Sequence, residues 1–291
     1  MRKVRADFFR ATFSQKVRTF EAFLENLNHL SKAKRLRTLS SEAALYMPNV
    51  RHRSEHLWTG ELQYIRRTNL PDKIDLSTLV DGALGLEPNQ GLLERCHFAY
   101  RTDLEALALQ SSRYVRSGTF ESYVMHVEET PFELTLIIRR GAYHKFLKMR
   151  TIASVAVKIE NPPNAAEFKR LQDPGVSAMA DLLTNFGAAK IDVTLKRENR
   201  GHVTLSIDGI KHFVDRLRNR QSVAESVTSL VIKGKREDDE RLEAVDLIED
   251  RLTFEDTVKY DEQRRLDPAE CERLVINALE HHARALQREA E

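Results

Sequence analysis

An α+β fold, with mixed and mostly antiparallel sheets against packed helices, is predicted for this chain of 291 residues. Segments with strand-like alternation and segments with helical spacing both occur, but they do not follow one another as regular strand–helix–strand units. Hydrophobic residues make up 41% and charged residues 31%, which is typical of a folded protein with a hydrated surface. Charge is also segregated along the chain, which bears on the binding partners that we expect.

The N-terminal half contains both patterns. Helix 17–30 is predicted because six apolar residues, from Val17 to Leu30, share one helical face. Helix 117–129 is predicted from a serine N-cap. The strands are predicted from alternating apolar and polar residues, and this alternation slips at Gly60, which a β-bulge would explain. These strands are expected at residues 4–9, 56–67, on both sides of Thr102–Asp103 within 92–110, and at 131–140.

The C-terminal half is read in the same way. Pro162 and Pro163 end one strand, Gly187 stands where a helix C′ residue is expected, and Pro268 suits the first turn of the last helix. Strands are expected at residues 151–163, within 189–207 as a hairpin that turns near 199–201, at 227–236 and within 241–260. Helices are expected at residues 141–149, 176–187, 208–220 and 267–291.

Acidic and basic residues occupy different stretches. Residues 1–67 carry 14 Lys+Arg against 6 Asp+Glu, and residues 135–220 carry 16 against 8. Residues 68–134 and 221–291 are acidic, with 5 against 11 and 11 against 19. This segregation predicts either a basic surface that meets a polyanion, or acidic and basic parts that meet each other.

Three parts of the chain follow from these patterns. The polar stretch 234–241 marks the change from basic to acidic sequence and is the best boundary, and Arg139–Gly141 is a weaker one. We therefore expect an N-terminal α+β part at 1–138, a basic DNA-binding part at 139–236, and acidic C-terminal strands and a helix at 237–291. The last part is expected to pack back on the first.

Three basic runs lie within residues 139–220 without balancing acids. If they are neighbours in space, they form one surface that can bind duplex DNA through its phosphates without reading bases. The alternative is that each run is only the hydrated side of its own element. The predicted DNA-binding residues are Arg139, Arg140, Lys145, Lys148, Arg150, Lys196, Arg197, Arg200, Lys211, Arg218 and Arg220.

No motif indicates a reaction. His52 and His56 fit an H-x-x-E-H zinc pattern, but Pro48 and the strand that follows oppose the helix that this pattern needs. Asp173–Pro174 resembles the start of a nuclease motif without the acid-x-Lys that should follow. We therefore predict no catalytic or metal-binding residue and no cofactor, and the sequence favours a non-enzymatic protein without deciding the question. A divergent metal-dependent nuclease that uses Asp173 or Asp192 is one alternative, and a protein-interaction module without nucleic acid is another.

The cellular setting is predicted from what the chain contains. Its longest apolar runs fall short of the roughly 20 residues that span a bilayer, so no membrane insertion is expected. Cys96 and Cys271 belong to no spaced set, and we expect both to be reduced, buried core residues of a cytoplasmic protein.

One part of the chain resembles a known family. The order of elements through GLLERCHFAY, TLIIRR, MRTIASVAVKIENPPN and LLTNFGAAKIDVTLK, within residues 90–200, resembles the phage exclusion protein RexA and its relatives. The DNA-binding subunit of the Kiwa defence system, KwaB, is similar in role. The resemblance implies a cytoplasmic homodimer with a globular part and a smaller, mobile basic part, which clamps duplex DNA with little sequence preference. It also implies that the protein excludes superinfecting phage and acts through a membrane-protein effector.

Charge and resemblance together predict one function. We expect non-enzymatic, largely sequence-independent binding of duplex DNA in phage exclusion or anti-phage defence. The acidic C-terminal part would contact a partner, or would mimic DNA and hold the basic surface closed.

Overall fold

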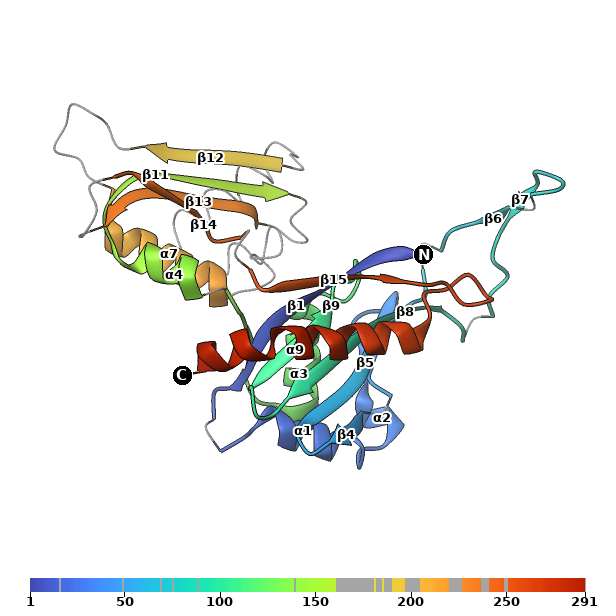
Figure 1. The fold of residues 1–291 in the computed structure, drawn as a ribbon. Coiled ribbons are helices and arrows are strands. Elements are labelled where there is room, and N and C mark those ends of the chain that lie inside the picture. The colour runs from blue at the N-terminus through green and yellow to red at the C-terminus, as the bar shows by residue number, and fades with distance from the viewer. Residues whose placement is uncertain are drawn as a thin grey trace. The chain divides into compact units, whose positions relative to one another are not determined.

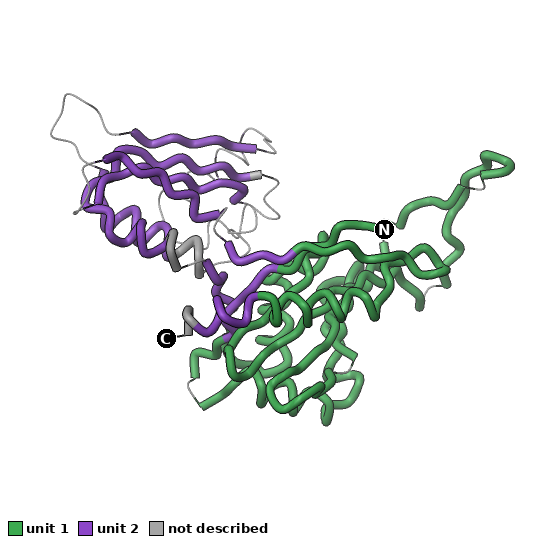
Figure 2. The backbone as a smooth tube through the Cα atoms, in the orientation of Figure 1, with its two compact units in different colours: residues 1–6, 12–132, 255–281 green, residues 7–11, 133–254, 282–291 purple. Residues whose placement is uncertain are grey.

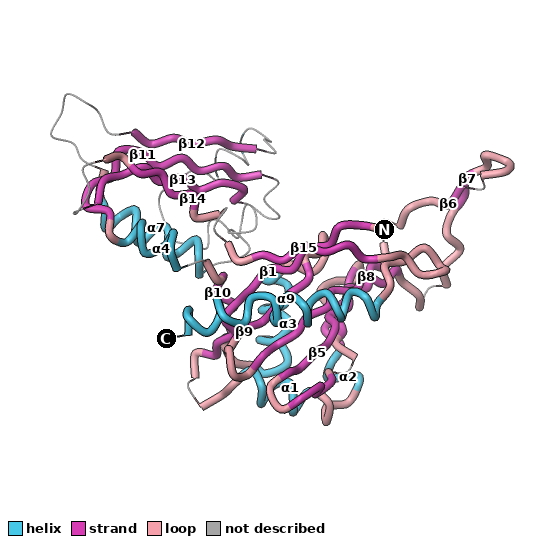
Figure 3. Tube along the Cα trace, viewed as in Figure 1, coloured by secondary structure: helices cyan, strands magenta, loops and turns pink. Residues whose placement is uncertain are grey.

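The computed structural model describes residues 1–15, 17–48, 50–68, 70–74, 76–87, 89–138, 140–160, 181, 185, 190–196, 205–219, 227–236, 241–248 and 251–290. Most of the helix predicted at 176–187 and the turn predicted near 199–201 lie outside these residues. Within them, helices and mostly antiparallel open sheets occur together, so the predicted α+β class is confirmed (Figure 3).

Two compact units divide the chain, and each is built from several segments (Figure 2). Unit 1 comprises residues 1–6, 12–132 and 255–281, and unit 2 comprises residues 7–11, 133–254 and 282–291. The units change at residue 133, whereas both predicted boundaries, Arg139–Gly141 and 234–241, lie inside unit 2. Residues 237–254 belong with the basic stretch, whereas residues 255–281 return to unit 1.

A nine-stranded sheet contains most of the strands of unit 1 (Figure 1). Its main path has the order β10-β1-β9-β8-β5-β3-β2, with β15 paired to β1 and β4 paired to β5. The strands are β1 (Arg2–Phe13), β2 (Leu36–Thr38), β3 (Ala43–Tyr46), β4 (Arg51–Ser54), β5 (Leu57–Arg66), β8 (Leu92–Arg101), β9 (Ala106–Gln110), β10 (Phe132–Leu136) and β15 (Thr253–Val258).

Helices of unit 1 cover both faces of this sheet. On one face, Phe20 of α1 (Phe20–Leu27) packs against Tyr100, and Phe120 of α3 (Ser117–Glu128) packs against Phe98. On the other face, the side chain of Gln110 at the end of β9 meets Cys271 of α9 (Pro268–Ala290), with 3.9 Å between Nε2 and Sγ. A short helix, α2 (Lys32–Arg35), precedes β2.

The start and the buried face of helix α1 both follow from its sequence. Thr19 caps it by accepting a hydrogen bond from the backbone N–H of Ala22 at 3.1 Å, and the buried side chains recur at helical spacing. The predicted start at Val17 was wrong, because Val17 precedes the cap and is 95% exposed.

The predicted bulge at Gly60 was also wrong. The pairing of β5 with β8 runs without a register shift from Leu57 to Arg66, and Gly60 lies opposite Phe98. A Cβ atom on Gly60 would lie 2.6 Å from Phe98 Cζ, so the glycine leaves room for the aromatic ring.

The core of unit 2 is a four-stranded antiparallel sheet of order β12-β11-β13-β14. Its strands are β11 (Met149–Glu160), β12 (Lys190–Lys196), β13 (Val227–Arg236) and β14 (Glu243–Asp246). Two helices, α4 (Arg140–Leu147) and α7 (Ile207–Asn219), contribute Phe146, Ile210 and Val214 to the core under this sheet (Figure 1). Tyr143 of α4 also donates a hydrogen bond to Asp215 of α7, which ties the two helices together.

A small hairpin, β6 (Lys73–Ile74) and β7 (Asp81–Gly82), forms a separate two-stranded sheet within the connection between β5 and β8. None of the described helices combines the length and hydropathy needed to cross a bilayer.

Candidate functional site

One face of the four-stranded sheet has no described helix packed on it. Along β11, Val155, Val157 and Ile159 are buried toward α4 and α7, because successive side chains of a strand point to opposite faces. Ala156 and Lys158 consequently point away from that core. We call this second surface the open face.

The strand register aligns two lysines on the open face. Ser154 of β11 is paired with Lys196 of β12 on one side and with Lys233 of β13 on the other. Since neighbouring strands lie about 4.8 Å apart, the backbones of the two lysines are about 10 Å apart, with a serine between them. We call Lys196, Ser154 and Lys233 the lysine row, and both lysines are exposed.

Acidic residues also reach the open face. Asp192 is paired with Lys158 across β12 and β11, and Asp246 is at the edge on β14. Asp246 already accepts hydrogen bonds from Ser229 Oγ at 3.0 Å and from the Ile248 N–H at 2.9 Å. Within the described part of unit 2, no ion pair involves either lysine of the row. The lysine row therefore combines two exposed cations with a small polar residue between them.

The sequence-predicted binding residues divide between the two sides of this sheet. Lys196 is on the open face, whereas Lys145 and Lys211 are on the helices of the opposite side, and Lys148 and Arg150 are exposed near the end of α4. Lys145 forms an ion pair with Glu243 of β14 at 3.0 Å. Of the remaining predictions, Arg140 and Arg218 are backbone positions in α4 and α7, and Arg139, Arg197, Arg200 and Arg220 lie outside the described residues.

Sequence reasoning missed Lys158 and Lys233. Both lysines lie in largely apolar strands, outside the three basic runs from which the binding residues were predicted. The available signal was the alternation itself, because buried Val157 and Ile159 require Lys158 between them to face outward.

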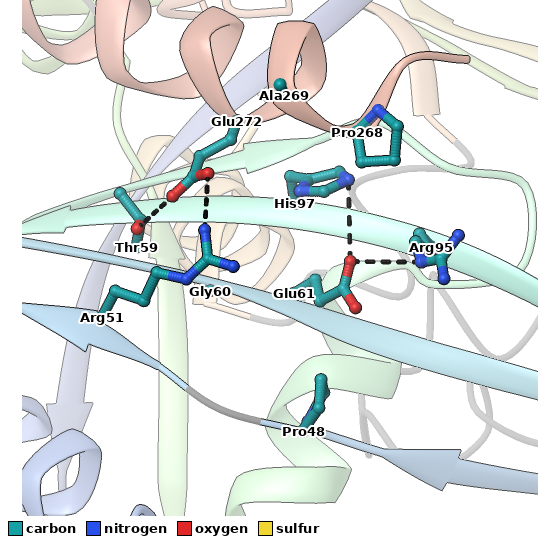
Figure 4. Close-up of a pocket in the computed structure, with 10 residues that line it drawn as sticks. All are labelled: Pro48, Arg51, Thr59, Gly60, Glu61, Arg95, His97, Pro268, Ala269 and Glu272. Carbon is teal, nitrogen blue, oxygen red and sulfur yellow. Dashed lines mark hydrogen bonds and ion pairs between the residues drawn. The ribbon is translucent and has the colours of Figure 1, made fainter. Parts of the chain in front are cut away.

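A cleft of about 460 Å³ in unit 1 is the second candidate (Figure 4). It lies where the first turn of α9 passes over β5 and β8. The lining residues are Pro48, Arg51, Thr59, Gly60, Glu61, Arg95, His97, Pro268, Ala269 and Glu272.

Glu272 is the most highly bonded acid of this cleft. Its carboxylate accepts hydrogen bonds from Thr59 Oγ1 at 2.6 Å, Arg53 Nη2 at 2.6 Å and Arg51 Nη1 at 3.1 Å. Arg51 and Arg53 are two residues apart in β4, so their side chains point to the same face of the sheet. Thr59 is the cross-strand partner of Arg51 and shares that face. Burial raises the pKa of Glu272, but the hydrogen bonds of Thr59 and Arg53 outweigh it and hold this pKa below its ordinary value.

Glu61 organises the other side of the cleft. It lies 3.4 Å from Arg95 Nε and 3.8 Å from His97 Nε2, and it is the cross-strand partner of His97. His97 is 6% exposed, and burial lowers its pKa although Glu61 and Glu272 act to raise it. The imidazole is therefore neutral near pH 7.

The chemical capacity of the cleft follows from this pairing. Its carboxylates are already held by guanidinium groups, so neither is an exposed base. The described residues contain no group of three or more side chains suited to hold a metal ion. His52 packs against Trp58 with the ring planes tilted and the ring centroids 4.5 Å apart, and it lies on strand β4, not on a zinc-binding helix. Both cysteines are buried, as predicted, and neither of them forms a disulfide bond.

Comparison with known proteins places the chain in one family. The sequence model of a family of unknown function, DUF6731, matches residues 1–285, so the chain belongs to this family. The match extends over both compact units. No curated protein matches the chain.

Proposed function

We propose that this protein binds duplex DNA through the sugar–phosphate backbone, with little sequence preference, and that the open face of unit 2 is the contact surface. The observation that supports the proposal best is the lysine row, in which Lys196 and Lys233 flank Ser154 on three neighbouring strands. Lys158 adds a third exposed cation to the same face.

The residue types suit phosphate better than bases. Lysine is a flexible point charge, which binds phosphate oxygens without the planar geometry that base recognition uses. The small side chains of Ser154 and Ala156 leave space for a backbone to approach the sheet. Affinity that depends on phosphates falls steeply with salt, because binding releases condensed counterions.

A cytoplasmic role in phage exclusion is the setting that we propose for this binding. It is supported by the resemblance of residues 90–200 to the RexA family, which also suggests a membrane-protein effector. The Lys145–Glu243 pair joins the basic stretch to the acidic C-terminal part.

The test measures binding of a labelled random-sequence duplex of about 30 base pairs across a salt series without metal. Replacement of Lys158, Lys196 and Lys233 by Glu is expected to weaken binding at least 100-fold at low salt. The log–log salt slope is expected to flatten by about 0.9 for each phosphate that the variant no longer neutralises.

Two matched triple variants make the same change in charge elsewhere. K145E/K148E/K211E places it on the helical side of unit 2, and R2E/K3E/R67E places it on exposed cations of unit 1. Both are expected to change affinity less than threefold. Loss of binding only in the helical-side variant would move the site to the residues predicted from sequence, and no binding by wild-type protein at low salt would reject the function.

A further inference from the structure

The connection between β5 and β8 carries an exposed apolar arm, residues 70–87. Ile74, Leu76, Leu79 and Val80 are 55–76% exposed, although they follow one another closely in the chain. Monomeric proteins rarely expose several large aliphatic side chains together, and such a patch usually marks a contact surface.

The arm is also incomplete as a sheet. Among its described residues, the two strands pair through Lys73–Gly82 and Ile74–Asp81 only. A two-stranded hairpin is marginal in water, and a third strand with an apolar face is normally needed to stabilise it. A strand from elsewhere would complete this small sheet and cover its apolar side chains.

Edge strand β2 of unit 1 offers the complementary surface. It ends the path of the nine-stranded sheet and is paired to β3 on one side, with no described strand on the other. Leu36 and Leu39 are 37% and 42% exposed along this edge. An unpaired edge with apolar side chains readily accepts another strand.

The two surfaces carry opposite charges. Residues 70–87 contain four acids and one base, whereas residues 31–41 around β2 contain four bases and no acid. Asp72, Asp81 and Glu87 of the arm are exposed, as are Lys32 and Lys34 beside β2. This complementarity favours contact between the arm and the edge and gives the pairing its orientation.

The arm starts beside the strands that it would meet in a second copy. The N–H of Arg67, where the arm leaves β5, donates to the carbonyl of Glu42 at 2.8 Å, in the turn that joins β2 to β3. Two copies related by a two-fold axis near their β2 edges can therefore exchange arms, because each arm begins near the edge of its neighbour.

We propose that the protein forms a symmetric dimer in which the arm of each copy adds to edge strand β2 of the other. Exchange of two arms buries both apolar patches twice over, and a specific interface needs roughly 1,000–1,200 Å² of buried surface. The proposal concerns unit 1 alone and does not depend on DNA binding.

The test is the molar mass of the full chain by light scattering and sedimentation from about 1 to 100 µM at low salt. Wild-type protein is expected to be dimeric, and L76D/L79D/V80D is expected to be monomeric with an unchanged circular dichroism spectrum. K32E/K34E is expected to weaken the dimer at least tenfold. A fully monomeric wild-type protein at the highest concentration would overturn the proposal.

Charge exchange identifies the partner surfaces. D72K/D81K and K32E/K34E are each expected to dimerise weakly, and an equimolar mixture is expected to form more heterodimer than either forms homodimer. A mixture of L79C and L39C chains is expected to form a mixed disulfide under oxidation. One outcome would reject β2 as the acceptor. In it, L76D/L79D/V80D is monomeric, K32E/K34E dimerises like wild type, and the mixture of D72K/D81K with K32E/K34E forms no additional heterodimer.

Discussion

The cleft of unit 1 and the open face of unit 2 both contain several cations, but they differ in how those cations are paired. In the cleft, Arg51 and Arg53 bind Glu272, and Arg95 binds Glu61. On the open face, Lys196 and Lys233 flank an uncharged serine. Among the described residues, local pairing, more than net charge, separates arginines that hold a cleft together from lysines without an ionic partner.

The largest expected effect comes from removing the acid that pairs with the arginines of the cleft. Glu272→Ala removes the acceptor of buried Thr59 and of two arginines and is expected to destabilise the protein by about 2–3 kcal/mol. Chemical denaturation would measure this loss, with exposed Glu280→Ala on the same helix as the control, expected within about 0.5 kcal/mol of wild type. Equal losses for the two variants would mean that pairing in the cleft does not matter.

A smaller loss is expected from the packing beneath the cleft. Gly60→Ala brings a Cβ within 2.6 Å of Phe98 Cζ and 2.9 Å of Val50 Cγ1, so buried groups must shift, at a cost of about 1–2 kcal/mol. Gly82→Ala in the arm is the control, because a Cβ there meets nothing within 4 Å. Thermal unfolding of the two variants checks the difference, and similar melting temperatures would contradict it.

The pH dependence tests the neutral state of His97. Burial lowers its pKa in the folded protein, so the unfolded chain binds the extra proton first as the pH falls below about 6.5. Stability is expected to be fully present above that pH and to fall below it, by at most about 1.4 kcal/mol for each pH unit. His97→Gln should flatten this decline between pH 7 and pH 5, and an unchanged slope would show that another group titrates.

The smallest expected effect comes from a change at Ser154, in the lysine row of the open face. Ser154→Lys adds a third cation to the lysine row, which is expected to steepen the log–log salt slope of DNA binding by about 0.9 and to change stability by less than about 0.5 kcal/mol. Ser154→Gln adds a side chain of similar length without charge and should leave the slope unchanged. If both variants bind like wild type, DNA does not touch the row.

The sequence predicted the long elements better than the sites. Alternation and helical spacing identified β5, β8, β11 and α9, because each buries one regular face. Strands β2, β3 and β4 were missed because three or four residues are too few to show a period. The binding residues predicted at Lys145 and Lys196 lie on opposite sides of one sheet, which only the register reveals.

The cleft was beyond sequence reasoning for a different reason. Glu272 accepts hydrogen bonds from Thr59 and Arg53, which are more than 200 residues away in the sequence. No local sequence pattern predicts a contact between residues so far apart. By contrast, the burial of both cysteines was predicted correctly, because burial is the common state of this residue type.

The return of residues 255–281 to unit 1 also has a consequence for how the protein is made. A chain synthesised at about 5–20 residues per second takes roughly 10–45 s to pass from Arg51 to Glu272, its ion-pair partner. Throughout that time the arginines of β4 and buried Thr59 lack their acceptor. Unit 1 therefore completes its folding only late in translation, after most of unit 2 has left the ribosome.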